Sequence, residues 1–230
     1  MRLLNTSTHK LEEFPDDTPP YAILSHRWGP DEVLPGYAKI EMTCRIAAES
    51  GIEYAWIDTC CINKTDSSEL SESINSMYRW YQESTVCYAY LADESEWFQR
   101  GWTLQELLAL SAVVFLNAAW KELGTKLSLW KDVHDCTGIP GVFLAGEDAH
   151  SASIAQRMSW AAGRNTTKVE DRAYSLMGHF GIYMPILYGE KENAFFRLQE
   201  EILKVISDDH TIFAWTDWEP LLPALGMLGK

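Results

Sequence analysis

The sequence Val-Cys-Tyr-Ala-Tyr-Leu at residues 86–91, followed by Arg-Gly-Trp-Thr-Leu-Gln-Glu-Leu-Leu at residues 100–108, predicts a buried strand that leads into a helix. The first run is short and apolar, as in a strand inside a sheet. On the helix, Trp102 and Glu106 are four residues apart and share a face. An acidic side chain beside a large aromatic, near the carboxyl end of a strand, is typical of a small-molecule site. The alternative is that Trp102 belongs to the core and that Glu106 is simply solvated.

Three further apolar runs fit strands of the same sheet. They are Tyr-Ala-Ile-Leu-Ser at 21–25, Tyr-Ala-Trp-Ile-Asp at 54–58 and the run at 113–116. Apolar residues at helical spacing separate these runs, over 40–48 and again over 74–81. Strands that alternate with helices through short connections predict an α/β, flavodoxin-like fold, with a parallel sheet covered by helices on both faces.

Polar side chains cluster directly after the carboxyl ends of three of the predicted strands. Because ligands of such sheets bind outside the carboxyl ends of the strands, we expect the clusters to converge on one site. The candidate residues are Ser25, His26, Arg27 and Trp28 after the first strand, Asp58 after the second, and Arg100, Trp102 and Glu106 after the third. Structural alternatives stay open: Ser25 can end its strand with a backbone hydrogen bond, Asp58 can cap a loop, and Arg27 can pair with a structural carboxylate.

The strand–helix alternation stops near residue 120. Residues 121–150 contain several glycine and proline breakers and predict an irregular connection. Helical patterns return over 154–162, 173–180 and 193–206, the second preceded by Thr167 and Glu170 at capping-box spacing, and residues 211–215 fit a final strand. We therefore expect a single domain over 1–230, with an α/β core at 20–120 and a helical annex at 151–215 packed on it.

The charge of the chain restricts its partners. The formal net charge is −14, and no basic cluster offsets it locally. Such a surface repels nucleic-acid backbones and anionic lipids, so we expect no nucleic-acid partner. A nucleotide would need arginines near the site, such as Arg27, Arg79 or Arg100, to hold its phosphates.

Targeting and cysteine patterns point to the cytoplasm. No apolar run is long enough to cross a bilayer, and residues 1–10 lack the apolar stretch of a secretory signal. The five cysteines have no metal-ligand spacing, and we expect them to be reduced thiols. No metal site is expected.

Six stretches of the chain together form a recognisable set of sequence blocks. They are, in order, 21–29 (Tyr-Ala-Ile-Leu-Ser-His-Arg-Trp-Gly), 56–64 (Trp-Ile-Asp-Thr-Cys-Cys-Ile-Asn-Lys), 73–81, 100–108, 157–178 and 184–189 (Met-Pro-Ile-Leu-Tyr-Gly). Taken together, these stretches resemble the fungal heterokaryon-incompatibility (HET) domain. Two small departures from the family are visible, at Leu110, where the family usually has proline, and at Asn63, where aspartate is frequent. The resemblance implies a role in fungal non-self recognition that ends in regulated cell death.

A more distant resemblance links residues 20–120 to TIR domains of innate immunity. The stretch 23–29 resembles the TIR strand-and-loop opening, and Trp102-Thr-Leu-Gln-Glu-Leu107 is similar to the Trp-Cys-Leu-x-Glu-Leu stretch of plant TIRs. In enzymatic TIRs the glutamate of this stretch is essential for cleaving NAD. Matched on that motif, the equivalent residue here is Glu106, which implies a possible NAD glycohydrolase, a hydrolase with one catalytic glutamate.

One carboxylate suffices for this reaction on chemical grounds. Hydrolysis of ordinary glycosides needs two carboxyl groups, but nicotinamide leaves NAD as a neutral base, so no acid is required. A dry, anionic Glu106 would stabilise the oxocarbenium-like ribose. Trp28 or Trp102 would stack on a base, Arg27 or Arg100 would meet the pyrophosphate, and Asp58 would make polar contacts. NAD is then a substrate, with no cofactor required, and NADP or another nucleotide stays open.

A non-catalytic module is the alternative function. In it, death follows from self-assembly or from recruiting a partner protein, and Glu106 has no chemical role. Both hypotheses, the NAD-cleaving effector and the non-catalytic module, imply self-association and either an attached sensor of the NLR type or a separate partner protein.

Overall fold

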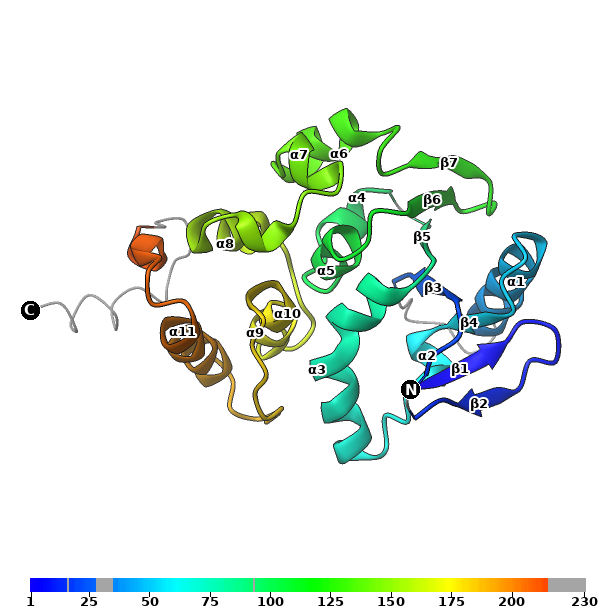
Figure 1. The fold of residues 1–230 in the computed structure, drawn as a ribbon, viewed down its shortest axis with the longest axis horizontal. Helices are drawn as coiled ribbons and strands as arrows, with labels where there is room; N and C mark the ends of the chain where they lie inside the picture. The colour runs from blue at the N-terminus through cyan, green and yellow to red at the C-terminus, as the bar shows by residue number, and fades with distance from the viewer. Residues whose placement is uncertain (16, 28–34, 93, 215–230) are drawn as a thin grey trace, which may run out of the picture.

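A computed structural model describes residues 1–15, 17–27, 35–92 and 94–214 of the chain. Its centre is a sheet of seven strands in the order β2-β1-β4-β3-β5-β6-β7 (Figure 1). The strands are β1 (Arg2–Asn5), β2 (Leu11–Glu13), β3 (Tyr21–Ser25), β4 (Tyr54–Trp56), β5 (Val86–Leu91), β6 (Val113–Asn117) and β7 (Glu122–Thr125). The four central strands, β4-β3-β5-β6, are parallel. They are the four strands predicted from the apolar runs, and their order is that of the flavodoxin-like fold.

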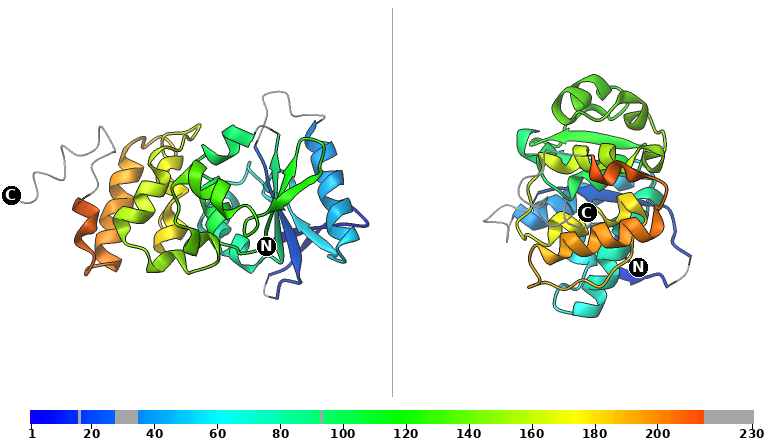
Figure 2. Two further views of the ribbon diagram at one scale, coloured as in Figure 1. Left: turned by 90° about the horizontal axis from the view of Figure 1, so that it is seen from above. Right: turned by 90° about the vertical axis from the view of Figure 1, so that its left-hand side faces the viewer.

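Helices lie on both faces of the sheet, as predicted. Figure 2 shows α1 (Pro35–Glu49) on one face and α3 (Ser67–Glu83) with α5 (Thr103–Leu108) on the other. The helix α3 begins at Asp66, whose side chain accepts hydrogen bonds from the backbone of Ser68 and Glu69. The parallel strands are therefore buried between two helical layers, which explains their continuous apolar runs.

Three strands, the edge strands β2 and β7 and the strand β1 next to β2, were not predicted. β1 pairs antiparallel with β2 and with β4, and β7 pairs antiparallel with β6. β2 and β7 are three and four residues long and largely exposed, so neither shows an apolar run. Short, polar edge strands limit pairing with other chains and leave little signal in sequence.

The region 121–150 is more ordered than expected. Besides β7 it contains α6 (Trp130–Thr137), α7 (Gly141–Leu144) and a short 3-10 helix, η1 (Ala149–Ser151). Gly138, Pro140 and Gly141, which suggested an irregular connection, lie at the ends of these short helices; Gly138, for example, ends α6 with a φ of 69°.

The C-terminal helices form a further layer on the α3 and α5 side of the sheet (Figure 2). They are α8 (Ile154–Ala162), α9 (Asp171–Tyr174), α10 (Met177–Phe180) and α11 (Asn193–Val205). Two predictions here are wrong. Residues 210–213 form a 3-10 helix, η2 (His210–Phe213), and not a strand. Thr167 and Glu170 form no capping box, because the Glu170 carboxylate accepts from the backbone of Gly189 and Lys191 instead.

The remaining elements are short helices beside the sheet, α2 (Asp58–Cys61) and α4 (Glu94–Phe98). All five cysteines are free thiols, as predicted, and Cys44, Cys61 and Cys87 are buried. In the described ranges, no helix has both the length and the apolar character needed to span a bilayer.

Candidate functional site

Glu106 is the buried acidic residue of the site. All six residues of α5 are buried, and this short helix contacts α3, α4 and α7. Glu106 lies in the first turn of α5 and is only 7% exposed. The alternative of a solvated Glu106 is therefore wrong, whereas Trp102 is partly buried and does pack against the core.

A chain of side-chain hydrogen bonds orients the Glu106 carboxylate. The hydroxyl of Ser25, the last residue of β3, donates to Oε2 of Glu106. The same hydroxyl oxygen accepts from Nε1 of Trp97, in α4, at 2.8 Å. Ser25 is thus held from both sides, and the carboxylate is fixed at the carboxyl end of β3.

The environment of Glu106 raises its pKa to about 7. Burial is the largest cause, since it removes the charged form from water. The hydrogen bond from Ser25 acts in the opposite direction, as do the positive charges of Arg100 and Arg164, whereas the Asp58 carboxylate raises the pKa further. A carboxylate that titrates near neutral pH in a cavity is typical of functional sites.

Glu106 lines a cavity of about 540 Å³ at the carboxyl ends of β3 and β4. Aromatic and aliphatic side chains make up much of the wall, including Trp56, whose buried indole nitrogen has no hydrogen-bond partner within the described residues. The wall consists of Leu24, His26, Trp56, Asp58, Ile62, Lys64, Leu70, Ile74, Met77, Tyr81, Arg100, Trp102, Thr103, Glu106, Thr167, Lys168, Asp171 and Tyr188.

The polar residues after β3 and β4 face each other in this cavity. Nδ1 of His26 lies 3.8 Å from Oδ1 of Asp58, and Nζ of Lys64 lies 3.2 Å from Oδ2 of the same carboxylate. The His26 side chain is almost completely buried, whereas that of Asp58 is partly exposed. Asp58 is also the first residue of the short helix α2, whose N-cap residue is Ile57.

The C-terminal layer supplies the opposite wall. Tyr188 donates a hydrogen bond of 2.9 Å to Asp171, and Nζ of Lys168 lies 3.6 Å from the centre of the Tyr188 ring. Burial raises the pKa of Asp171, and hydrogen bonds from Tyr188 and Trp102 partly offset this rise. The cavity therefore lies between the sheet and the annex.

Arg164 fixes the annex to the segment that carries Glu106. Its guanidinium donates to the backbone oxygen of Arg100 and to Oγ1 of Thr103, both at 3.0 Å, and to the backbone oxygen of Trp160 at 3.1 Å. Burial lowers the pKa of Arg164 to about 10, and Glu106 acts against this. At that pKa the guanidinium is positive at neutral pH.

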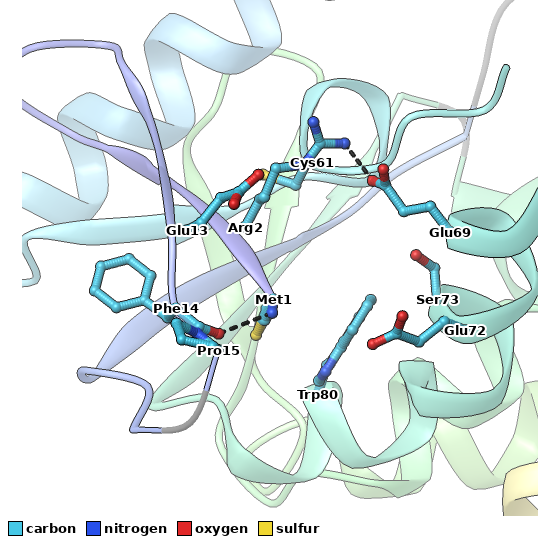
Figure 3. Close-up of a pocket in the computed structure, with 10 residues that line it drawn as sticks. All are labelled: Met1, Arg2, Glu13, Phe14, Pro15, Cys61, Glu69, Glu72, Ser73 and Trp80. Atoms are coloured by element: carbon cyan, nitrogen blue, oxygen red, sulfur yellow. Dashed lines mark hydrogen bonds and ion pairs between the residues drawn. The ribbon is translucent and has the colours of Figure 1, made fainter. Parts of the chain in front are cut away.

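A separate cavity of about 280 Å³ lies next to the N-terminal residues (Figure 3). Three glutamates line it, and Arg2 forms an ion pair with one of them, Glu69. None of the residues predicted for the site is in its wall. Its acidic lining makes it unsuited to phosphates.

Sequence comparison places the chain in a family. Residues 21–96 match the family model described as Heterokaryon incompatibility protein (HET). Over 220 residues the chain is 43% identical to the vegetative incompatibility protein HET-E-1 of Podospora anserina, an alignment that covers 81% of the chain. The chain carries a HET domain. It spans about 16% of the length of HET-E-1. No solved structure matches the HET domain closely.

The predicted site residues of the HET domain fall into three groups. His26, Asp58, Arg100, Trp102 and Glu106 line the same cavity. Ser25 and Arg27 differ from expectation, because buried Ser25 lies behind Glu106 and is not in the cavity wall, and Arg27 forms an ion pair with Glu96 beside a neighbouring cavity. Trp28 lies outside the described residues.

Other residues of the HET domain site were missed. Trp97, Arg164, Lys168 and Asp171 were not among the predicted site residues. Each reaches the site through a contact between distant parts of the chain, which periodicity does not reveal. The available signal was the resemblance over 157–178, which contains three of them. In the described part of the HET domain, no three His, Cys, Asp or Glu side chains gather as metal ligands would.

Proposed function

We propose that this HET domain is an effector of fungal non-self recognition, in which self-association switches on cleavage of NAD at the nicotinamide–ribose bond and so causes cell death. The incompatibility role is supported by the match to HET-E-1. The cleavage is supported above all by one observation: Glu106 is buried and oriented by Ser25 in the wall of a cavity that is partly apolar.

The chemistry required of the site is modest. The bond between C1′ of the ribose and N1 of nicotinamide breaks, and its electron pair leaves with the neutral nicotinamide. The Glu106 carboxylate stabilises the positive charge that develops on the ribose. Water then attacks C1′ and loses its proton to the carboxylate, which releases it to solvent. Trp102, in the wall near Glu106, offers an aromatic face for the nicotinamide or the adenine.

The pKa of Glu106 sets the pH range of the reaction. The carboxylate must be ionised to stabilise a positive charge, and its pKa is about 7. Cleavage is therefore expected to rise about tenfold per pH unit below this value and to level off above it. The removal of water by a bound substrate strengthens the electrostatic effect of the ionised form.

Release of nicotinamide by the purified domain tests the proposal. Incubated with NAD at high protein concentration, the wild type is expected to release nicotinamide and ADP-ribose, and Glu106→Gln to lose this activity by about 100-fold or more. Glu49→Gln is the matched control, because Glu49 is an exposed carboxylate at the end of α1, on the other face of the sheet. It should retain full activity.

Expression in fungal cells distinguishes the proposal from the non-catalytic alternative. Cell death and loss of cellular NAD should both disappear in Glu106→Gln and persist in Glu49→Gln. If folded Glu106→Gln still kills cells without consuming NAD, the domain acts through assembly or a partner protein, and the catalytic proposal is wrong.

A further inference from the structure

A second cavity adjoins the one that contains Glu106. Its volume is about 270 Å³, and its wall includes Arg27, Glu96, Gln99 and Asn165. Two residues, Arg100 and Thr167, line both cavities. Arg100 therefore stands between them, with the buried carboxylate on one side and the Arg27–Glu96 ion pair on the other.

A backbone contact between the core and the annex builds the boundary between these cavities. The backbone nitrogen of Asn165 donates to the oxygen of Gln99 at 2.6 Å, and that of Gly101 donates to the oxygen of Asn165 at 2.9 Å. Gly101 permits this approach, since a Cβ there would lie 2.5 Å from Cγ2 of Thr166. The main chain around Arg100 is thus held from both sides, while its side chain lines the cavities.

Basic side chains lie on both sides of this boundary in a chain with a net charge of −14, and acidic ones accompany them: Glu96 pairs with Arg27, and Asp58 and Asp171 line the larger cavity. Arg100 lines both cavities, Lys168 lines the larger one and Arg27 lines the smaller one. A guanidinium binds phosphate oxygens in bidentate geometry. The buried negative charge, by contrast, lies in the larger cavity, where a cationic ring fits.

We propose that the two cavities form one site for a dinucleotide, which deepens the proposed function and rests on it. The nicotinamide riboside half lies beside Glu106, the diphosphate lies at Arg100, and the second nucleoside occupies the cavity lined by Arg27 and Gln99. The domain thereby selects dinucleotides over mononucleotides, and the annex residues 165–167 form one side of the second nucleoside site.

Substitution of Gln99 tests the second cavity without altering the first. Gln99 is exposed and lines the smaller cavity, and its structural contact is made by its backbone oxygen. Gln99→Trp fills that cavity and should raise the KM for NAD about tenfold, while the KM for nicotinamide mononucleotide stays within about twofold. Gln82→Trp, the matched control, adds the same ring at an exposed residue of α3 that lines neither cavity, and should change neither value to that extent. Equal KM changes for both substrates in Gln99→Trp, or no change for NAD, would overturn the dinucleotide site.

Calorimetric binding of ADP-ribose separates this proposal from the catalytic one. If the wild type cleaves no NAD, the catalytic proposal fails, and the two-cavity site is judged on binding alone. ADP-ribose should bind the wild type and Gln82→Trp alike and bind Gln99→Trp about tenfold more weakly. Absence of ADP-ribose binding to the wild type, or equal binding to all three proteins, would refute the site.

Discussion

At the scale of single residues, the Glu106 carboxylate is buried and receives few hydrogen bonds to replace the water it has lost. It is buried, and it has one hydroxyl donor, Ser25, whose own oxygen is held by Trp97. One hydrogen bond does not compensate for the loss of water around a full charge, so burial outweighs the neighbouring arginines and the pKa rises to about 7. The ionised carboxylate is consequently a cost to the folded state.

The sign of this cost gives a stability prediction for Glu106→Gln. The folded pKa of Glu106 is about 7 and the usual value is 4.5. Between these values the folded protein holds a proton that the unfolded chain releases, so the wild type loses stability as pH rises, by about 3 kcal/mol in all. The glutamine of Glu106→Gln carries no charge at any of these pH values. The free energy of unfolding of this variant, minus that of the wild type, should therefore increase by about 3 kcal/mol from about pH 4 to about pH 8.

Urea denaturation of both proteins at the two pH values measures this difference. A difference that stays constant with pH would mean that the carboxylate titrates normally and is not desolvated.

At the scale of elements, the contact between α3 and α10 determines where the annex lies. Gly178 in α10 packs so closely on α3 that a Cβ at this position would lie 2.2 Å from Cβ of Tyr78. Tyr78 also makes an edge contact with the buried ring of His179. Neither Gly178 nor Tyr78 can move away without shifting its helix, since the atoms in contact lie on or next to the backbone.

We expect Gly178→Ala to destabilise the domain by about 2 kcal/mol through overpacking and to loosen the annex. Gly163→Ala is the control, because no atom lies within 4 Å of a Cβ built there and the φ of −87° suits any residue. Thermal unfolding measures both variants, and equal melting temperatures would contradict the close contact.

Prediction from sequence succeeded for elements with local patterns. The runs 21–25 and 86–91 are fully apolar or nearly so because they are central parallel strands, and both were located to the residue. β7 was missed because its four residues carry no buried apolar pattern. The residue pair Thr167 and Glu170 has the right spacing for a cap, but Glu170 binds the distant backbone of Gly189. Residues of the annex that line or support the site were missed for the same reason, since they reach it through contacts between distant parts of the chain.

At the scale of the whole molecule, the net charge of −14 opposes the self-association that the proposed function requires. Salt screens this repulsion within about 8–10 Å at moderate ionic strength. Self-association of the isolated domain should therefore strengthen as sodium chloride is raised from about 50 to about 500 mM. Sedimentation velocity over a protein concentration series measures it. Weaker association at high salt would indicate complementary charged patches at the contact.

The Arg164 bonds, finally, bear on how far this chain can be shortened. A fragment ending near residue 120 would keep all four parallel strands and everything that the family model matches. In such a fragment, Thr103 and the carbonyl of Arg100 would lose their hydrogen bonds from the Arg164 guanidinium. One side of the Glu106 cavity would then be open to bulk water. The smallest piece able to keep that glutamate dry has to run at least to Tyr188, the last residue of the wall. Evolution can likewise change this pocket by substitutions in the annex, beyond the last strand of the sheet, with the strands themselves unchanged.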